Sequence, residues 1–565
     1  MLEKERALAS KFRAAWAAVL VGSLLLTACG ASGVSPGESD GDGGTDGGPT
    51  GEIVTVTPRL VGQGQDPITQ AALEWSHKPW WDDVHDFVIE QNADGNLVAG
   101  LATEWGVSED GLTWTFTLRE DVKFHNGDTL TAEDVAWSWN RVVFDPASTH
   151  TMIGRAELIE SIAADGNQVI VTTTSPQAAV PFWWAEHDGE SGGAVYSQAY
   201  FEEVVDEMWS APVGTGPYKL VSMEGEQSAT LTAFVDDDRS DWQKERTPGF
   251  KDVTIRAAED PSTRVALVRT GEADVAPLPI SAVEELEGTD VEIIEVPAAT
   301  QSVMWCLGFS LNTDSPCNDV GVREALSIAI DRQGIADSVY RGYAAPHNGY
   351  IAGPGAFGNA EDLEAPPYDP ERAQQLLADA GFDESNPLQV EIVVADVPGD
   401  MPLMPTLAEA ISGNYADIGV QATVRVGEEE ANKEALFGFE FNGQEEGDPS
   451  LPITLYMRGM DNRFYFVDSQ LTQFTDDSEN GSSVWNDETF PEMTERLLAI
   501  AAEFDVDTQA EMMADYHRWM AENWLQMPLL TASAVYGVSE KVGSWDLRIA
   551  GKGFVHNHWS LRPAD

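Results

Sequence analysis

The chain has 565 residues, about three to four times the length of a typical domain, so a single simple core is not expected. Hydrophobic residues make up 42% and charged residues 22%, which excludes a wholly disordered or fibrous chain. Asp and Glu number 95 against 32 Lys and Arg, and the net charge of −63 argues against nucleic acid or anionic lipid as a partner of the folded part.

The N-terminus has the features of a secretory signal with a lipid-attachment site. Four basic residues precede an apolar run of 13 residues, 14–26, which suits a signal-peptide core and is short for a bilayer span. The run ends in Leu-Thr-Ala-Cys-Gly, which resembles the bacterial lipobox, where the cysteine is acylated and becomes the mature N-terminus. We therefore expect residues 1–28 to be removed and Cys29 to carry the lipid. An uncleaved anchor and a plain secretory signal are the alternatives.

Residues 29–51 are expected to form a flexible tether. From residue 30 onward they contain nine glycines and four acidic residues, with no large apolar side chain to bury. A random coil of this length spans about 25 Å. The sequence therefore predicts a tethered globular part outside the cytoplasmic membrane.

From residue 52 onward, strand and helix patterns are mixed. Alternating or β-branched runs predict strands at 53–56, 113–118, 169–173, 252–257, 291–296 and 389–394. Thr131 as N-cap and Asp134 at the third helical position predict a helix start after a turn at 126–128. Further helices are predicted at 322–331, 370–380 and 491–524. This mixture over some 500 residues predicts an α/β protein with at least two lobes.

Several motifs resemble one known family. Residues 96–142 (NLVAGLATEWGVSEDGLTWTFTLREDVKFHNGDTLTAEDVAWSWNRV) look like the signature of the extracytoplasmic solute-binding proteins of the peptide/nickel class, family 5, which deliver ligand to ABC importers. Matching segments follow in the family's order: PVGTGPYKL at 212–220, DPSTRVALVRTGEADV at 260–275, VGVREALSIAIDR at 320–332 and YDPERAQQLLADAGF at 368–382. The similarity spans nearly all of residues 52–565.

The resemblance implies a two-lobed α/β fold of the periplasmic-binding-protein type II class, with a subdomain inserted in lobe one. Lobe one would comprise 52–80, 209–298 and 526–565, the inserted subdomain 81–208, and lobe two 299–525. The hinge strands would lie near 297–309 and 525–530, and closure would bury a ligand between the lobes.

Some motif residues are expected to serve the fold. Gly214 and Gly216 suit a positive φ or a close backbone approach. Arg323 and Asp331 are expected to satisfy each other or a helix end.

The family resemblance also suggests residues that face the cleft. Aromatic rings near Trp80, Trp81, Trp305 and Trp485 often do so in this family, and broad rings suit ligands of varied sequence. Peptide binders of the class commonly hold the ligand's ammonium with an Asp, and Asp448 stands at the matching place. The surrounding GQEEGDPSLP departs from the family's usual pattern. Core packing for the tryptophans and turn capping for Asp448 are the alternatives.

Three cysteines exclude a disulfide-dense scaffold and a multi-cysteine zinc module. After lipidation of Cys29, Cys306 and Cys317 remain, with ten residues between them. In an oxidising compartment we expect them to form a disulfide.

Catalytic and metal motifs are weak. Gly189–Gly193 fits Gly-x-Ser-x-Gly, but the neighbouring glycines indicate a loop rather than the strand-to-helix turn of a hydrolase. His556 and His558 have the spacing of two ligands on one strand face and lack an evident third. We therefore predict no enzyme activity, no cofactor and no resident metal.

The sequence therefore predicts a monomeric, lipid-anchored solute receptor on the outer face of the bacterial membrane. It would capture a small molecule, most favourably a peptide, and deliver it to an ABC permease with a separate ATPase. An oligosaccharide is the second ligand class because tryptophan rings stack on sugars. Nickel, haem and opines remain open, and a surface hydrolase or adhesin is the remote alternative.

Overall fold

The computed structural model describes most of the chain after the predicted tether. The described residues are 48–60, 68, 79–91, 97–148, 155–185, 193–204, 211–306, 315–348, 357–395, 403–427, 453–460, 491–545 and 557–564. All of them belong to one compact unit, Gly44–Asp565. Among them, no helix is both long and apolar enough to cross a membrane.

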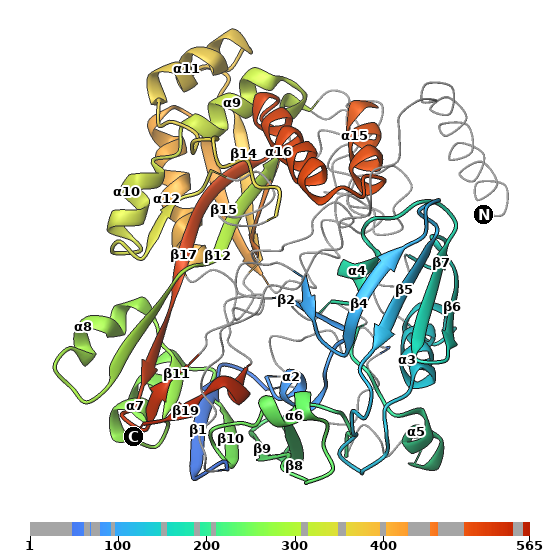
Figure 1. Cartoon of the computed structure of the whole chain (residues 1–565). Helices are drawn as coiled ribbons and strands as arrows, with labels where there is room; N and C mark the ends of the chain where they lie inside the picture. Colours follow the sequence, from blue (N-terminus) through green and yellow to red (C-terminus); the bar gives the residue numbers. More distant parts are fainter. Residues whose placement is uncertain are drawn as a thin grey trace. The chain divides into compact units, whose positions relative to one another are not determined.

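The main element is a mixed sheet of eleven strands (Figure 1). In order of pairing its strands are β15 (Gln421–Gly427), β14 (Gln389–Ala395), β16 (Ile453–Met460), β12 (Glu292–Cys306), β17 (Met527–Val538), β11 (Val275–Pro277), β1 (Glu52–Thr57), β10 (Asp252–Ala257), β9 (Ser228–Ala233) and β8 (Tyr218–Glu224), with β13 (Ala344–Pro346) also on β17. β1 runs parallel to β10 and β11, and β14 runs parallel to β15 and β16. The two parallel groups are therefore joined through β12 and β17, which are antiparallel to each other.

A second, antiparallel sheet lies within residues 102–173. Its order is β4 (Ala102–Val107), β5 (Thr113–Leu118), β7 (Gln168–Thr173) and β6 (Ile159–Asp165). The buried side chains of β5 alternate along the strand, as its sequence predicts. Helix α3 (Ala132–Phe144) packs against β6 and β7. The predicted capping box is present, because Thr131 accepts from Asp134 N and Asp134 Oδ2 accepts from Thr131 N.

The remaining elements are short or cover the sheets. Two small sheets pair β2 (Ile89–Gln91) with β3 (Leu97–Ala99), and β18 (Val542–Ser544) with β19 (Arg562–Pro563). The other α-helices are α2 (Trp81–Val84), α4 (Val180–Trp183), α5 (Gln198–Val204), α6 (Asp241–Glu245), α7 (Pro261–Thr270), α8 (Val283–Leu286), α9 (Val320–Ile328), α10 (Arg332–Ser338), α11 (Pro370–Asp379), α12 (Met404–Asp417), α15 (Pro491–Ala501) and α16 (Val506–Glu522). Short 3₁₀ turns are η5 (Ile280–Ala282), η6 (Pro316–Asn318) and η8 (His558–Ser560).

Two predicted helices are wrong in their extent. The helix expected at 322–331 ends at Ile328, because Asp331 instead caps α10 by accepting from Gly334 N at 2.9 Å. The single helix expected at 491–524 is two helices, and Asp505 starts the second by accepting from Thr508 N at 2.9 Å. In both places a capping carboxylate competes with continuation of the helix.

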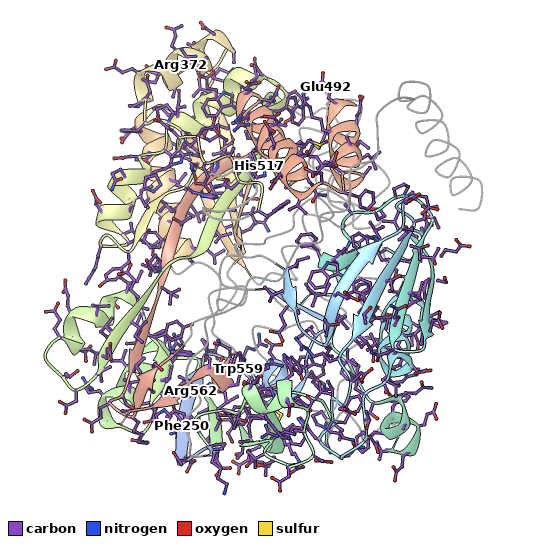
Figure 2. The ribbon with its side chains drawn as sticks, viewed as in Figure 1. Phe250, Arg372, Glu492, His517, Trp559 and Arg562 are labelled. Atoms are coloured by element: carbon purple, nitrogen blue, oxygen red, sulfur yellow. The ribbon has the colours of Figure 1, made fainter. Side chains whose placement is uncertain are left out.

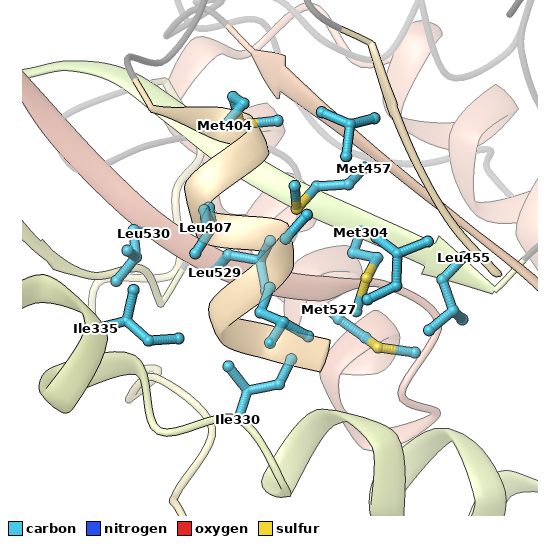
Figure 3. Packing of buried hydrophobic residues seen from close by; sticks show 14 of the residues in the cluster. Met304, Ile330, Ile335, Met404, Leu407, Leu455, Met457, Met527, Leu529 and Leu530 are labelled. Carbon is cyan, nitrogen blue, oxygen red and sulfur yellow. The ribbon is translucent and has the colours of Figure 1, made fainter. Parts of the chain in front are cut away.

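Three clusters of buried apolar residues hold these elements together. In the largest, α12 lays Met404 and Leu407 against Met304 of β12, Met457 of β16 and Leu529 of β17 (Figure 3). The second cluster fills the space between α3 and its four-stranded sheet. The third lies around β1, β9 and β10 and contains the aromatic rings at 80 and 81.

Candidate functional site

The main sheet narrows to two strands near its middle. β17 pairs with β13 at residues 530–532 and with β11 at 536–538. Between these stretches, single backbone bonds join Ser533 N to Tyr343 O at 2.8 Å and Leu278 N to Val535 O at 2.7 Å. β16 pairs with β12 only from Gln301 onward. Among the described strands, β17 is thus the sole neighbour of the first part of β12.

The register of this two-strand ribbon is interrupted where it is narrowest. The pairing of β12 with β17 shifts between Val296 and Thr300, and again between Gln301 and Val303. Such irregularities remove ladder bonds and let strands bend. A side-chain bond from Ser533 Oγ to Glu295 Oε1 at 2.6 Å spans the ribbon beside the first shift. The geometry therefore favours bending at this place, where only two strands carry an irregular register.

A small cavity of about 20 Å³ lies at the carboxyl ends of β1 and β11. Its walls come from seven separate places in the chain: Thr55, Val56, Thr57, Pro79, Ile255, Val275, Pro277, Tyr536, Trp545 and His558. The β10–α7–β11 connection crosses over β1, because β1 pairs with both β10 and β11. In open α/β sheets, ligands bind outside the carboxyl ends of strands at such crossings.

One wall of the cavity carries a buried chain of polar groups. Thr55 Oγ1 lies 3.0 Å from His558 Nε2, and His558 Nδ1 lies 2.5 Å from Asp83 Oδ2. The other carboxylate oxygen of Asp83 accepts from Trp559 N at 3.1 Å. All three side chains are at least 95% buried. Burial raises the pKa of Asp83 above its ordinary value, and the contact with His558 counteracts this shift only in part.

Close backbone packing positions Asp83. A Cβ on Gly216 would lie 2.6 Å from Asp83 O, and one on Gly214 would collide with Val84 O. This confirms the close approach expected of the two glycines. The C-terminal segment with Trp559 and Arg562 lies next to the chain around Phe250 (Figure 2), where Leu561 O approaches Gly249. Segments from four parts of the sequence thus hold the polar chain in place.

The threonine, histidine and aspartate have the order of a nucleophile, a base and an orienting acid. The cavity beside Thr55 holds only about one water-sized group, so a scissile bond does not fit there. The arrangement is therefore suited to binding a small polar group and to holding the C-terminal segment in place.

The predicted cleft tryptophans are placed as follows. Trp80 and Trp81 are 1% and 3% exposed and pack edge-on at 5.2 Å within an apolar cluster. Trp305 lies on β12 opposite Tyr456, and its side chain is outside the described residues. Trp485 and Asp448 also lie outside the described residues. Ligand contact by any of the five stays a prediction, and Trp80 and Trp81 are packing residues in this structure.

The structure describes only one of the cysteine side chains for which the sequence makes a prediction. Cys317 is buried and disulfide-bonded. Cys306 lies on β12, and its side chain, like the whole of Cys29, is outside the described residues. Pairing of Cys317 with Cys306 therefore stays a prediction.

Arg323 and Asp331 each satisfy a helix end, as expected. Arg323 donates from Nη2 to Asn523 O at 2.8 Å at the end of α16. Among the residues with described side chains, no group of three or more His, Cys, Asp or Glu could hold a metal ion.

Sequence reasoning missed most of the polar chain. The sequence pattern marked His558 only as half of a His-x-His pair, and it did not mark Asp83. Thr55 was visible only as a strand residue. Thr55 and His558 are 503 residues apart in the sequence, and Asp83 and His558 are 475 residues apart, so no local pattern could have joined them.

The sheet topology and the strand ribbon define the fold of the type II periplasmic binding proteins. Residues 96–482 match the family described as bacterial extracellular solute-binding proteins, family 5, and the chain belongs to this family. The chain is similar to a nickel-binding periplasmic protein of Escherichia coli K12, at 28% identity over 64% of this chain and 69% of the relative. It is also similar to a glutathione-binding protein of the same organism, at 32% identity over 50% of this chain and 52% of that one.

Solved structures support the fold. A periplasmic binding protein from Helicobacter pylori in complex with the peptide STSA superimposes with a TM-score of 0.71 at 20% identity, covering 92% of this chain and 99% of the other. At this identity the likeness concerns the fold alone. The predicted fold class and family are confirmed.

Proposed function

We propose that this protein is the receptor of an ABC importer, which captures a solute between two hinged lobes and passes it to a membrane permease. The observation that carries the proposal is the match to family 5 over residues 96–482, combined with a sheet that narrows to β12 and β17. The hinge would be the irregular ribbon around residues 296–300. We keep the division into lobe one, inserted subdomain and lobe two at the boundaries expected from the sequence.

For the ligand we propose a peptide. Support comes from the glutathione-binding relative and the peptide complex with the same fold. An oligosaccharide remains the second candidate because the chain has 18 tryptophans. The relatives bind different solutes by name, including nickel and heme, so the family alone does not select one.

We further propose a monomer anchored at Cys29 through a lipid, outside the cytoplasmic membrane. The lipid anchor is supported by the basic and apolar start of the chain and by the lipobox-like sequence that follows it. The relatives are binding proteins, which agrees with a non-enzymatic role.

The decisive experiment combines mass spectrometry with solution scattering. Solute released from the purified mature protein by mild denaturation is identified and then added back to refolded, solute-free protein. We expect a smaller radius of gyration on addition, because closure of two lobes compacts the molecule. Bovine serum albumin with the same solute is the control. Unchanged scattering at saturating solute would contradict a hinged receptor.

A further inference from the structure

Two wall residues of the cavity at the end of β1, Thr55 and Trp545, can hydrogen-bond to a further group, although the Thr55 hydroxyl already contacts His558. Thr57 also lines the cavity, but its hydroxyl donates to Arg59 O at 3.0 Å. Trp545 and Thr55 both line the cavity, and each carries a polar group that can bond a further group. The other walls, apart from His558, are mainly apolar.

Trp545 brings a donor that needs an acceptor. Its ring stands edge-on to Tyr536 at 5.5 Å between centroids. Its Nε1 is buried, and no hydrogen-bond partner for it exists among the described residues. An indole N–H can only donate, and leaving it buried and unpaired is costly. The group that completes this site must therefore accept a hydrogen bond.

The Thr55 hydroxyl can adapt to that group. When His558 Nε2 donates to Thr55 Oγ1, the hydroxyl proton is free to point into the cavity. When Nε2 instead accepts from the hydroxyl, the lone pairs of Thr55 Oγ1 can accept a hydrogen bond from a group in the cavity. Asp83 holds the imidazole in one orientation through Nδ1, so the hydroxyl position is fixed in either case. A carboxylate oxygen fits the first arrangement, and a water molecule fits both.

We propose that this cavity is a subsite for one acceptor oxygen, bound by Trp545 Nε1 and the Thr55 hydroxyl. Its volume of about 20 Å³ admits a single oxygen atom rather than a larger group. The oxygen belongs to a carboxylate or carbonyl group of the captured solute, or to an ordered water. The solute source rests on the proposed function, because ligands enter at the carboxyl ends of such strands. The water source does not rest on it.

Crystal structures of the mature protein test the subsite. One crystal form uses protein as purified and the other uses protein refolded without solute. We expect density for an oxygen within about 3.2 Å of both Trp545 Nε1 and Thr55 Oγ1. Density continuous with a larger molecule identifies the solute as the source, and isolated density identifies water. A cavity without density in both forms overturns the subsite, while the compaction experiment judges the receptor function separately.

Two variants identify the atoms that hold the oxygen. Trp545→Phe keeps a ring and removes the N–H, and Thr55→Val keeps the shape and removes the hydroxyl. We expect the oxygen density to be lost or displaced in each. Trp105→Phe, on β4 of the other sheet, is the matched control and should retain it. An oxygen that stays in place in both test variants would show that other atoms bind it and would refute the proposal.

Discussion

At the scale of single residues, the buried hydrogen-bonded contact between Asp83 and His558 is the least expected feature of the chain. Both side chains are at most 4% exposed, and each would be expensive to bury alone. Asp83 also accepts from the backbone of Trp559, so the pair ties α2 to the C-terminal segment. A buried pair of this kind contributes little over an apolar pair, but loss of one partner leaves the other uncompensated.

Replacement of Asp83 by Asn should therefore be strongly destabilising. We expect the free energy of unfolding to fall by about 3–5 kcal/mol, measured by urea denaturation. Asp236→Asn, which breaks the exposed pair between Lys219 and Asp236 at 2.8 Å, is the control and should cost less than about 1 kcal/mol. Equal losses in the two variants would show that the Asp83 pair has no special role.

Histidines whose pKa values are lowered in the folded state make stability depend on pH. Burial lowers the pKa of His125 to about 4 and the pKa values of His347 and His517 to about 3. In the unfolded chain they titrate near 6.5, so below that pH the unfolded state binds more protons and gains stability. We expect thermal stability to fall from about pH 6.5 toward pH 4, by up to about 1.4 kcal/mol per pH unit for each histidine.

The variant His517→Gln measures the contribution of one of these histidines to the pH dependence. His517 is fully buried, and neither ring nitrogen has a hydrogen-bond partner among the described residues. In this variant, the unfolding free energy should depend less steeply on pH, because the contribution of one histidine is absent. A melting temperature that is constant between pH 7 and pH 5 in the parent protein would contradict the argument.

At the scale of elements, capping residues decide where helices begin. Asp319, Asp331, Asp369 and Asp505 each accept from a backbone N–H in the first turn of a helix. Asp331 and Asp505 interrupt two helices that the sequence predicts as continuous, and the other two fix where a helix starts. A cap has this effect because it satisfies N–H groups that otherwise lack partners. The irregular pairing of β12 and β17 acts at the same scale by locating the proposed hinge.

Thr131 offers a clean test of capping. Its hydroxyl accepts from Asp134 N at 3.3 Å and donates to Asp134 Oδ2 at 2.7 Å. Thr131→Ala should lower the free energy of unfolding by about 1 kcal/mol, whereas Thr131→Ser retains the cap and should lie close to the parent. Chemical denaturation of both variants measures the difference. Equal losses in Ala and Ser would assign the effect to the methyl group instead.

At the scale of the whole molecule, the net charge of −63 dominates. Charges of one sign repel one another in the compact state more than in the unfolded chain. Added salt screens this repulsion, since the Debye length shortens from about 10 Å at 0.1 M to about 3 Å at 1 M.

The melting temperature should therefore rise with salt. We expect the melting temperature to increase between about 0.05 M and about 1 M NaCl, as measured by differential scanning calorimetry at constant pH. Potassium chloride should act equally, because screening depends on ionic strength rather than on a specific ion. A melting temperature that falls with either salt would show that favourable ion pairs outweigh the acidic repulsion.

The sequence by itself determined the α/β class, the family and most element positions. Local rules suffice for these features: β5 follows its alternation, α3 starts at its capping box, and α11 ends before Gly381, whose φ of 91° suits glycine. The order of the motifs along the chain indicated the family, because each motif lies within one continuous segment.

Only the tertiary structure decided the candidate site. Thr55, Asp83 and His558 are distant in the sequence and meet because the C-terminal segment returns to the end of β1. The family resemblance suggests Trp80 and Trp81 as cleft residues, and ligand contact by them stays a prediction. Their packing in an apolar cluster was decided by the segments that the fold brings to them. Periodicity and capping are local properties of a chain, whereas a cavity is made by residues that only the complete fold places together.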